Sequence, residues 1–423
     1  MKKIIWIKHA SQLATLASGK QGPRAKTDMS ELGIIEDGSL WIENGIIQAV
    51  GTTKELEITY GERTEEADIV DASGHLVTPG LVDPHTHVVY GGSREREFEM
   101  RLEGATYMDI MNAGGGIHAT TRMTRAASEA ELIEQATRRL DSFLAHGVTT
   151  VEGKSGYGMN LETELKQLRV MKKLQETHPI DVVPTFMGAH AVPLEYKGQE
   201  DAFIDYLIDE VLPVVMEEKL AIFNDVFCEK GVFTPEQSER MLEAGKRVGL
   251  IPKIHADEIE SYGGAELAAK VGAISAEHLL KASEEGIQAM AKAGTIACLL
   301  PATALYLREE AAAGRRMIDE GVPVAISTDC NPGSSPTTSM PLVMNLACIS
   351  MRLTPAEALT AATYNAACAI KSEEKVGSLE IGKQGDVVLW DVKNYQELQY
   401  VFGVNHVKSV WKKGVQVVGE ATC

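Results

Sequence analysis

The sequence predicts an α/β fold in which a (β/α)8 TIM barrel carries a small β-sandwich domain formed by the N- and C-terminal segments. Eight apolar runs alternate with amphipathic segments in the middle of the chain. Both ends consist of short β-like runs separated by glycine turns, and polar residues follow the apolar runs of the middle part. The expected boundaries are residues 1–77 and 376–423 for the two parts of the β-sandwich domain, and 78–375 for the barrel.

Each predicted barrel strand is followed by a helical pattern. Ser128 with Glu131, and Thr234 with Gln237, form capping boxes that predict two of the helix starts. A doubly wound open sheet has the same alternation, but the number of strands and the position of the polar residues favour the barrel. The expected strands are Leu81–His87, Val148–Glu152, Val182–Met187, Ile222–Cys228, Leu250–His255, Ala273–Glu277, Thr295–Leu299 and Pro323–Thr328.

The two terminal segments are expected to fold together. Neither has enough strands for a stable sheet of its own, so their strands should pair in one small domain. The runs concerned are Leu40–Ile42, Ile46–Val50 and Ile69–Val70 at the N-terminal end, and Asp386–Trp390, Val407–Trp411 and Val415–Val418 at the C-terminal end.

Composition excludes several classes of partner. The net charge of −19 argues against nucleic-acid binding, which depends on clustered Lys and Arg. No apolar run is long enough to span a membrane, and Lys8 and His9 interrupt the short run Ile4–Ile7 before a signal peptide could form. Six scattered cysteines without a paired spacing favour reduced thiols. We therefore expect a cytoplasmic protein with no membrane and no nucleic-acid partner.

Candidate metal ligands lie at the ends of the predicted strands. His85 and His87 are two residues apart, so strand alternation would send both to one side. His255, His278 and Asp329 close three further strands. A lone histidine is more often a surface or core residue, but five placements at the carboxyl ends of barrel strands, where barrel enzymes hold their active sites, point to catalysis.

At these residues the sequence resembles the amidohydrolase superfamily of metal-dependent hydrolases, and within it the imidazolonepropionase family. The resemblance covers nearly the whole chain. The superfamily is indicated by Pro79–His87 and by Gly385–Val388. The narrower match lies in Gly91–Arg94, Lys154–Gly158, Phe186–His190, His255–Glu258 and Thr328–Ser334.

The resemblance implies an enzyme that opens 4-imidazolone-5-propanoate to N-formimidoyl-L-glutamate. It implies one divalent ion, Zn²⁺ or Fe²⁺, held by His85, His87, His255 and Asp329. The fourth barrel strand ends without a lysine, which favours a single metal, although Glu229 leaves a bridged second ion open.

The catalytic roles are a hypothesis about how such a reaction would proceed, and the substrate-binding roles follow by the same resemblance. Proton transfer and polarisation would fall to Glu258, His278 and Asp329. Residues expected to bind the substrate, which bears a carboxylate, are Arg94, Tyr157, His190, Asn331, Gly333 and Ser334. Glu258 could instead be a solvated loop carboxylate, Arg94 a helix-surface charge and Asn331–Ser334 a simple turn.

Two other functions share these features. A cytosine or guanine deaminase would have the same metal ligands and a glutamate near the histidine of the fifth strand, and a non-catalytic scaffold could keep the barrel alone. A homodimer is expected from the family pattern.

Overall fold

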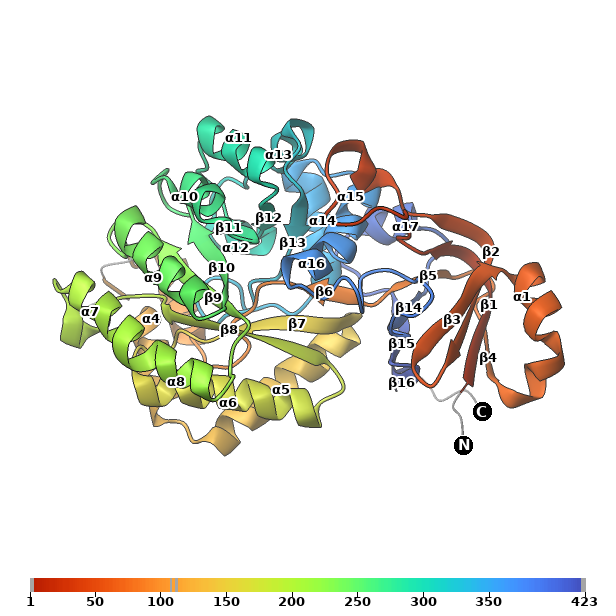
Figure 1. Ribbon diagram of the computed structural model, residues 1–423, viewed down its shortest axis with the longest axis horizontal. Helices are drawn as coiled ribbons and strands as arrows, with labels where there is room; N and C mark the ends of the chain where they lie inside the picture. Colours follow the sequence, from red (N-terminus) through yellow and green to blue (C-terminus); the bar gives the residue numbers. More distant parts are fainter. Residues whose placement is uncertain (1–3, 107–108, 111–112, 420–423) are drawn as a thin grey trace.

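The computed structural model of the protein describes residues 4–106, 109–110 and 113–419. The first residues, Met1–Lys3, and the cysteine at 423 lie outside these ranges, so the expectations about them stay predictions. Figure 1 shows two bodies side by side: a barrel surrounded by helices, and a smaller sheet beside which both chain ends lie. In the described ranges, the chain forms no helix of the length and apolarity that crossing a bilayer requires.

The larger body is a sheet of eight parallel strands in sequential order. All eight expected strands are present, which confirms the prediction of the barrel. Their bounds are β6 (Leu81–Asp83), β7 (Val148–Lys154), β8 (Asp181–Ala189), β9 (Phe223–Cys228), β10 (Ile251–Ala256), β11 (Ser275–His278), β12 (Ile296–Leu299) and β13 (Val324–Ile326). The first strand is shorter than expected, because it ends at Asp83 before Pro84, whose nitrogen has no hydrogen to donate.

Side chains complete the closure between the last strand and the first. The only backbone bridge recorded there among the described residues joins Thr86 to Cys330. The hydroxyls of Ser327 and Thr328 both donate to the buried Asp83 carboxylate, the latter at 2.6 Å. Burial raises the pKa of Asp83 to about 6, and these hydroxyl donors oppose the rise. The barrel is therefore closed partly by a polar side-chain cluster rather than by a continuous ladder.

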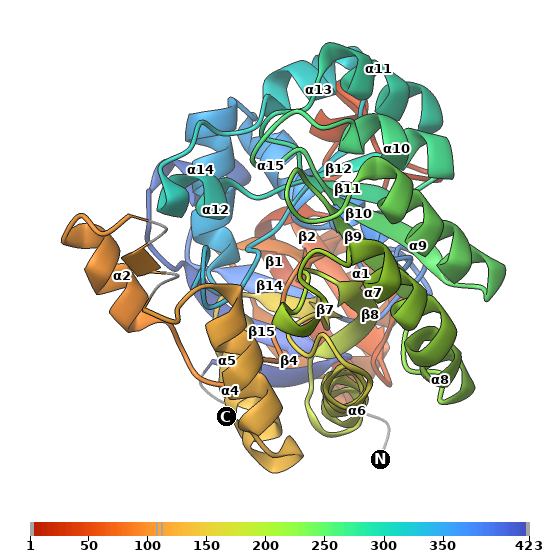
Figure 2. The ribbon, with the colours of Figure 1, turned by 90° about the vertical axis from the view of Figure 1, so that its left-hand side faces the viewer.

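Helices cover the outside of the barrel, as Figure 2 shows with α5, α6, α8, α9, α10 and α11 around the strands. The capping boxes at Ser128 and Thr234 form as expected and begin α5 and α9. The helices are α2 (Glu95–Leu102), α4 (Ile117–Ala126), α5 (Glu129–Ala145), α6 (Leu161–Thr177), α7 (Glu200–Tyr206), α8 (Leu212–Glu217), α9 (Pro235–Arg247), α10 (Gly264–Val271), α11 (Glu284–Ala293), α12 (Pro301–Leu307), α13 (Gly314–Glu320), α14 (Met340–Met351), α15 (Pro355–Ala361) and α16 (Tyr364–Ala369).

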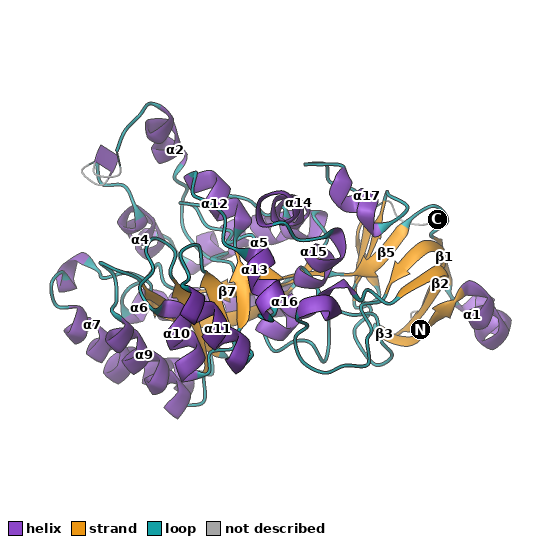
Figure 3. Ribbon diagram, turned by 90° about the horizontal axis from the view of Figure 1, so that it is seen from above, coloured by secondary structure: helices purple, strands orange, loops and turns teal. Residues whose placement is uncertain are grey.

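The smaller body is one mixed sheet built from both ends of the chain, as the sequence predicts. Its strands are β1 (Ile4–Ala14), β2 (Ile34–Glu43), β3 (Ile46–Thr52), β4 (Asp68–Asp71), β5 (Leu76–Pro79), β14 (Val387–Trp390), β15 (Val407–Lys412) and β16 (Val415–Val418), with α1 (Thr53–Tyr60) and α17 (Tyr395–Tyr400) beside it. Alternation along β1 sends Ile5 and Ile7 to one apolar cluster and Ile4 and Trp6 to another. Each face of the sheet thus buries its own apolar layer. Figure 3 shows the sheet as a body of strands beside the helices of the barrel.

The two bodies meet at a buried charge cluster. The Lys412 ammonium in β15 contacts Asp386 at 2.5 Å and Asp181, at the start of β8, at 2.7 Å. Lys413 contacts the same Asp181 at 2.8 Å. β5 belongs to the small sheet and β6 begins two residues after it ends. The exact domain boundaries stay a prediction.

Candidate active site

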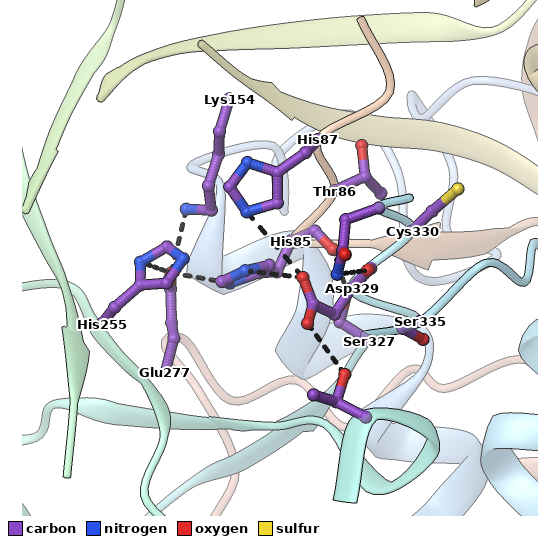
Figure 4. A network of polar contacts seen from close by, with 12 residues as sticks. His85, Thr86, His87, Lys154, His255, Glu277, Ser327, Asp329, Cys330 and Ser335 are labelled. Atoms are coloured by element: carbon purple, nitrogen blue, oxygen red, sulfur yellow. Dashed lines mark hydrogen bonds and ion pairs between the residues drawn. The ribbon is translucent and has the colours of Figure 1, made fainter. Parts of the chain in front are cut away.

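Five predicted site residues gather at the carboxyl ends of the barrel strands. His85 and His87 follow β6, His255 lies in β10, His278 ends β11, and Asp329 follows β13. Each is at most 3% exposed. In Figure 4 the rings of His85 and His87 lie beside the Asp329 carboxylate, and the His255 ring lies on the far side of His85. Because β6 stops at Asp83, the two histidines are held by the loop after the strand, where the backbone nitrogen of His87 donates to the carbonyl of Cys330 at 3.0 Å.

The donor atoms of this cluster fit a divalent ion. Ligand atoms of His85, His87 and His255 lie within 4.8 Å of one another, as do those of His85, His278 and Asp329. The Asp329 Oδ1 atom is 3.4 Å from His85 Nε2 and 3.8 Å from His87 Nε2. The Nε2 atom of His255 is buried without a hydrogen-bond partner, a cost of about 1–3 kcal/mol that coordination would remove. Imidazole and carboxylate ligands suit Zn²⁺ or Fe²⁺.

Two carboxylates that the sequence reasoning missed orient the histidines. Glu277 Oε2 is 2.8 Å from His85 Nδ1, and the Asp225 carboxylate is 3.1 Å from His255 Nδ1. In a neutral imidazole such partners keep the proton on Nδ1 and leave the Nε2 lone pair for the cluster. Burial alone would lower the pKa of His85, but Glu277 and Asp329 raise it to about 9 in the metal-free protein. A bound ion therefore has to displace that proton.

Asp329 is held in a single orientation. Thr303 at the start of α12 donates to its Oδ2 atom at 2.8 Å. Burial favours the neutral acid, but the contact with His85 outweighs it and lowers the pKa of Asp329 to about 2. The φ angles of Asp329 and His278 are +51° and +71°, in the left-handed region that side chains rarely adopt. Such strained backbone is common where a side chain is aimed at a functional site.

Glu258 lies beside His278 in the loop after β10. Its Oε1 atom is 3.6 Å from His278 Nδ1. Burial, and then the charges of Asp329 and Glu229, raise the pKa of Glu258 to about 8. Burial lowers the pKa of His278 well below its usual value, so this imidazole is neutral at pH 7. A carboxyl that titrates near neutral pH beside a neutral imidazole is suited to proton transfer.

Glu229 positions this loop. Its Oε2 atom accepts the backbone N–H groups of Glu258 at 3.0 Å and Ile259 at 2.9 Å, and its Oε1 atom accepts that of Lys230 at 3.0 Å. Both carboxylate oxygens are thus engaged by the backbone. In this arrangement Glu229 orients Glu258, while the sequence left it as a possible bridge to a second metal.

Tyr157 and His190 lie together on one side of the cluster. The His190 ring stacks on His87 with ring centroids 4.8 Å apart, and the Tyr157 ring is 5.3 Å from His190. Gly156 is required between them: its φ is +109°, and a Cβ atom there would lie 2.9 Å from His190. Burial lowers the pKa of His190 to about 3, so it is neutral.

The loop that carries Tyr157 is fixed by residues that the sequence reasoning missed. Glu164, buried in the first turn of α6, accepts the backbone N–H groups of Gly158 and Met159 at 2.8 Å and that of Gly156 at 3.0 Å. Gln167 in the same helix accepts the N–H of Tyr157 at 3.1 Å. In the sequence these two residues are an ordinary Glu and Gln in a helical pattern. Only the structure shows that their face of the helix is buried.

Arg94 lies at the start of α2 and is already paired. Its Nε and Nη2 atoms donate to Glu97 Oε2 at 2.9 and 2.7 Å. Its Nη1 atom points at Gly333, where a Cβ atom would lie only 2.2 Å away, so glycine is needed for this approach. Arg101, also missed, donates to the Gly333 carbonyl at 2.9 Å. The structure thus brings Arg94 to the predicted Asn331–Ser334 loop, with one terminal nitrogen free of Glu97.

Asn331, Gly333 and Ser334 form a compact turn after Asp329. The Asn331 Oδ1 atom accepts the backbone N–H groups of Gly333 and Ser334, both at 2.8 Å, and its amide donates to the Asp329 carbonyl at 2.7 Å. The hydrogen-bonding groups of the Asn331 side chain therefore stabilise the turn itself. Cys330 is buried in the core, and burial raises the pKa of its thiol to about 12, so it is no nucleophile at neutral pH.

Comparison with known proteins supports the family that the sequence resembles. The Amidohydrolase family matches residues 76–417. An imidazolonepropionase of Brevibacillus brevis is 65% identical over 420 residues, covering 99% of both chains, and one of Geobacillus sp. is 62% identical over 414 residues, covering 98% of both.

Solved structures share the fold at low identity. The guanine deaminase of E. coli superposes with a TM-score of 0.73 at 14% identity, covering 99% of this chain and 100% of its own. A triazine hydrolase superposes with a TM-score of 0.74 at 17% identity, covering 99% and 95%. These likenesses speak for the architecture alone. The family match and the full-length identity show that this chain is a hydrolase of the amidohydrolase superfamily and belongs, within it, to the imidazolonepropionase family.

Proposed function

We propose that this enzyme hydrolyses the cyclic amide-like C–N bond of 4-imidazolone-5-propanoate to give N-formimidoyl-L-glutamate, a step in histidine degradation. The observation that carries the proposal is the buried cluster of three imidazoles and one carboxylate at the barrel mouth, in a chain 65% identical to an imidazolonepropionase. The reaction adds water across the bond: its oxygen goes to the ring carbonyl carbon and its proton to the departing nitrogen.

We assign one divalent ion, Zn²⁺ or Fe²⁺, to His85, His87, His255 and Asp329. When bound, such an ion supplies Lewis acidity and lowers the pKa of water from about 15.7 toward roughly 7. The unpartnered Nε2 atom of His255, and the Asp329 oxygen 3.4 Å from His85 Nε2, support this assignment. The remaining work falls to side chains of the protein.

Proton movement is assigned to Glu258, with His278 and Asp329 beside it. Glu258 accepts a proton from the attacking water and returns it to the ring nitrogen that leaves, a role that its pKa near neutrality supports. His278, neutral and buried, hydrogen-bonds the oxygen on which negative charge develops. Asp329 accepts a hydrogen bond from the water and holds its lone pair toward the carbonyl carbon.

Binding of the substrate's propionate is assigned to Arg94, with Tyr157 and His190 along the ring. Guanidinium groups bind carboxylates through charge-assisted hydrogen bonds. Glu97 takes two donors of Arg94, so binding would use Nη1 or displace Glu97. The turn formed by Asn331, Gly333 and Ser334 closes this side of the site, and its shape rather than the Asn331 amide would contribute to binding.

The test is direct incubation with 4-imidazolone-5-propanoate. We expect its ultraviolet absorbance to fall and N-formimidoyl-L-glutamate to appear by mass spectrometry. Release of ammonia from cytosine or guanine, without loss of the imidazolone, would show a deaminase and refute the proposal. A metal-free protein inactive on all these compounds would point to a scaffold.

Two further proposals concern the cell and the assembly. We place the enzyme in the cytoplasm, where the buried thiols of Cys228, Cys298 and Cys368 would stay reduced. We also propose a homodimer, because Phe98, Leu102 and Leu305 are 41%, 59% and 61% exposed and line one hollow. Sedimentation velocity of the purified protein tests the dimer, and a monomer at micromolar concentration would exclude it.

A further inference from the structure

The barrel interior beneath the histidine cluster holds five charged side chains. They are Glu152 and Lys154 in β7, Asp225 in β9, Lys253 in β10 and Glu277 in β11, and each is 0% exposed. Burying charge is expensive unless every charge is paired, so such a layer needs a reason. Alternation in the strands places Lys154 two residues from Glu152, and Lys253 two residues from the candidate ligand His255, all facing inward.

Lys154 stands at the centre of this layer. Its Nζ atom is 2.7 Å from Asp225 Oδ2, 2.9 Å from Glu277 Oε2 and 3.0 Å from Glu152 Oε1. The three N–H donors of one ammonium thus meet three carboxylates from three strands. Lys253 contacts Glu152 at 2.8 Å and Glu277 at 3.1 Å and lies on the other side of these two acids.

The acids that hold Lys154 are the ones that touch the candidate metal ligands. Asp225 is 3.1 Å from His255 Nδ1, and Glu277 is 2.8 Å from His85 Nδ1 and 3.7 Å from His255 Nδ1. Ligand atoms of Asp225, His255 and Glu277 all lie within 4.8 Å of one another, a spacing that would suit a metal ion. Figure 4 shows the Lys154 amino group pointing toward His255 and Glu277 from the side of His87.

The balance of buried charges limits how many divalent ions the site can hold. Four buried carboxylates, Glu152, Asp225, Glu277 and Asp329, contact the two lysines or the candidate histidine ligands, and with these histidines neutral the six groups carry a net charge of minus two. One divalent ion at the histidine cluster cancels it. A second divalent ion added beside Lys154 would leave two positive charges buried without partners, whereas a second ion in place of Lys154 would leave only one.

We propose that the Lys154 ammonium occupies the position of a second metal ion, held by Asp225 and Glu277 beside His255, and thereby keeps the centre mononuclear. This rests on the proposed metal site at His85, His87, His255 and Asp329. Lys154 is a positioning residue: it fixes the two carboxylates that orient His85 and His255, and it touches neither the substrate nor the ion.

Metal stoichiometry tests the proposal. Wild type, Lys154→Met and Lys253→Met are saturated with Zn²⁺ or Co²⁺, desalted, and analysed by inductively coupled plasma mass spectrometry. We expect one equivalent for wild type and two for Lys154→Met. Lys253→Met removes the same charge but does not vacate the place between Asp225 and Glu277, so one equivalent is expected. Adding Asp225→Asn to Lys154→Met removes a ligand and should return the value to one.

The outcomes distinguish a failure of the role proposed for Lys154 from a failure of the proposed metal centre. No metal in wild type would refute the proposed centre itself. Two equivalents in wild type, or one in folded Lys154→Met, would overturn the role of Lys154 while leaving the centre intact. Should Lys154→Met fail to fold when metal-free, we expect millimolar Zn²⁺ to restore its circular dichroism spectrum, because the second ion replaces the lost cation. A variant that stays unfolded at that concentration would also overturn the proposal.

Discussion

Glu258→Gln should separate stability from activity. The side chain is only 15% exposed, and its surroundings raise its pKa from 4.5 to about 8. For an acid with a raised pKa, the folded state keeps a proton that the unfolded state loses. Stability therefore falls as pH rises from about 4.5 to 8, and the loss is complete above that window. Glutamine cannot ionise, so the metal-free variant should escape this loss.

The size of the effect follows from the pKa difference. At pH 7 a rise from 4.5 to about 8 corresponds to on the order of 3 kcal/mol, an upper bound because water reaches part of the side chain. Metal-free Glu258→Gln should therefore unfold at higher temperature than metal-free wild type, with a gap that widens from pH 5 to pH 8. A bound cation lowers the pKa of Glu258, so the gap should shrink when Zn²⁺ is added.

The activity of Glu258→Gln should fall, although its stability rises. Glutamine keeps the size of the side chain but cannot transfer a proton, so kcat should fall by about 10²-fold or more while metal content is unchanged. Glu260→Gln is the matched control, because Glu260 is exposed on the same loop and pairs with Lys230. Near-normal turnover of Glu258→Gln, or a pH dependence of stability equal to that of wild type, would refute the reasoning.

The remaining predictions concern the metal and the substrate. A chelator should abolish activity and leave the circular dichroism spectrum unchanged, with recovery on adding Zn²⁺ or Fe²⁺; full activity in metal-free protein would contradict the metal site. His255→Ala should lose metal by elemental analysis, and retention of a full equivalent would remove it from the ligand set. Arg94→Met should raise KM about tenfold to a hundredfold, from roughly 1.5 to 3 kcal/mol of lost charge-assisted hydrogen bonding, with metal content constant. If wild type and Arg94→Met disfavour a neutral amide analogue of the substrate equally, Arg94 does not bind the carboxylate. Tyr157→Phe should give a smaller rise in KM, and a fall in kcat alone would assign it to chemistry instead.

The sequence was informative where local pattern decides the structure. Eight apolar runs predicted eight strands, and capping boxes at Ser128 and Thr234 predicted two helix starts, because both signals depend on neighbouring residues. The end of the first strand was wrong by several residues: Pro84 stops the ladder at Asp83, and the expected alternation of His85 and His87 is produced by a loop instead.

The site residues that the sequence reasoning missed are those whose role depends on contacts with distant parts of the chain. Glu277 was visible next to His278, but its partners His85, Lys154 and Lys253 come from other strands. Glu164 looked like an ordinary helix residue until the loop that it holds was placed beside it. One signal was available: charged residues inside strands that are otherwise apolar, such as Lys253, require buried partners.

The small sheet has a consequence for how the protein is made. β5 pairs with β1 on one edge and with β14 on the other, so its second edge has no partner until the end of the chain is synthesised. β14 begins at Val387, about 300 residues after β5, which at roughly 5–20 residues per second means a delay of about 15–60 seconds. The barrel has time to collapse during that interval while β5 remains open to strands of other nascent chains. Ribosomes that stall before β14 should therefore release chains that aggregate through this edge.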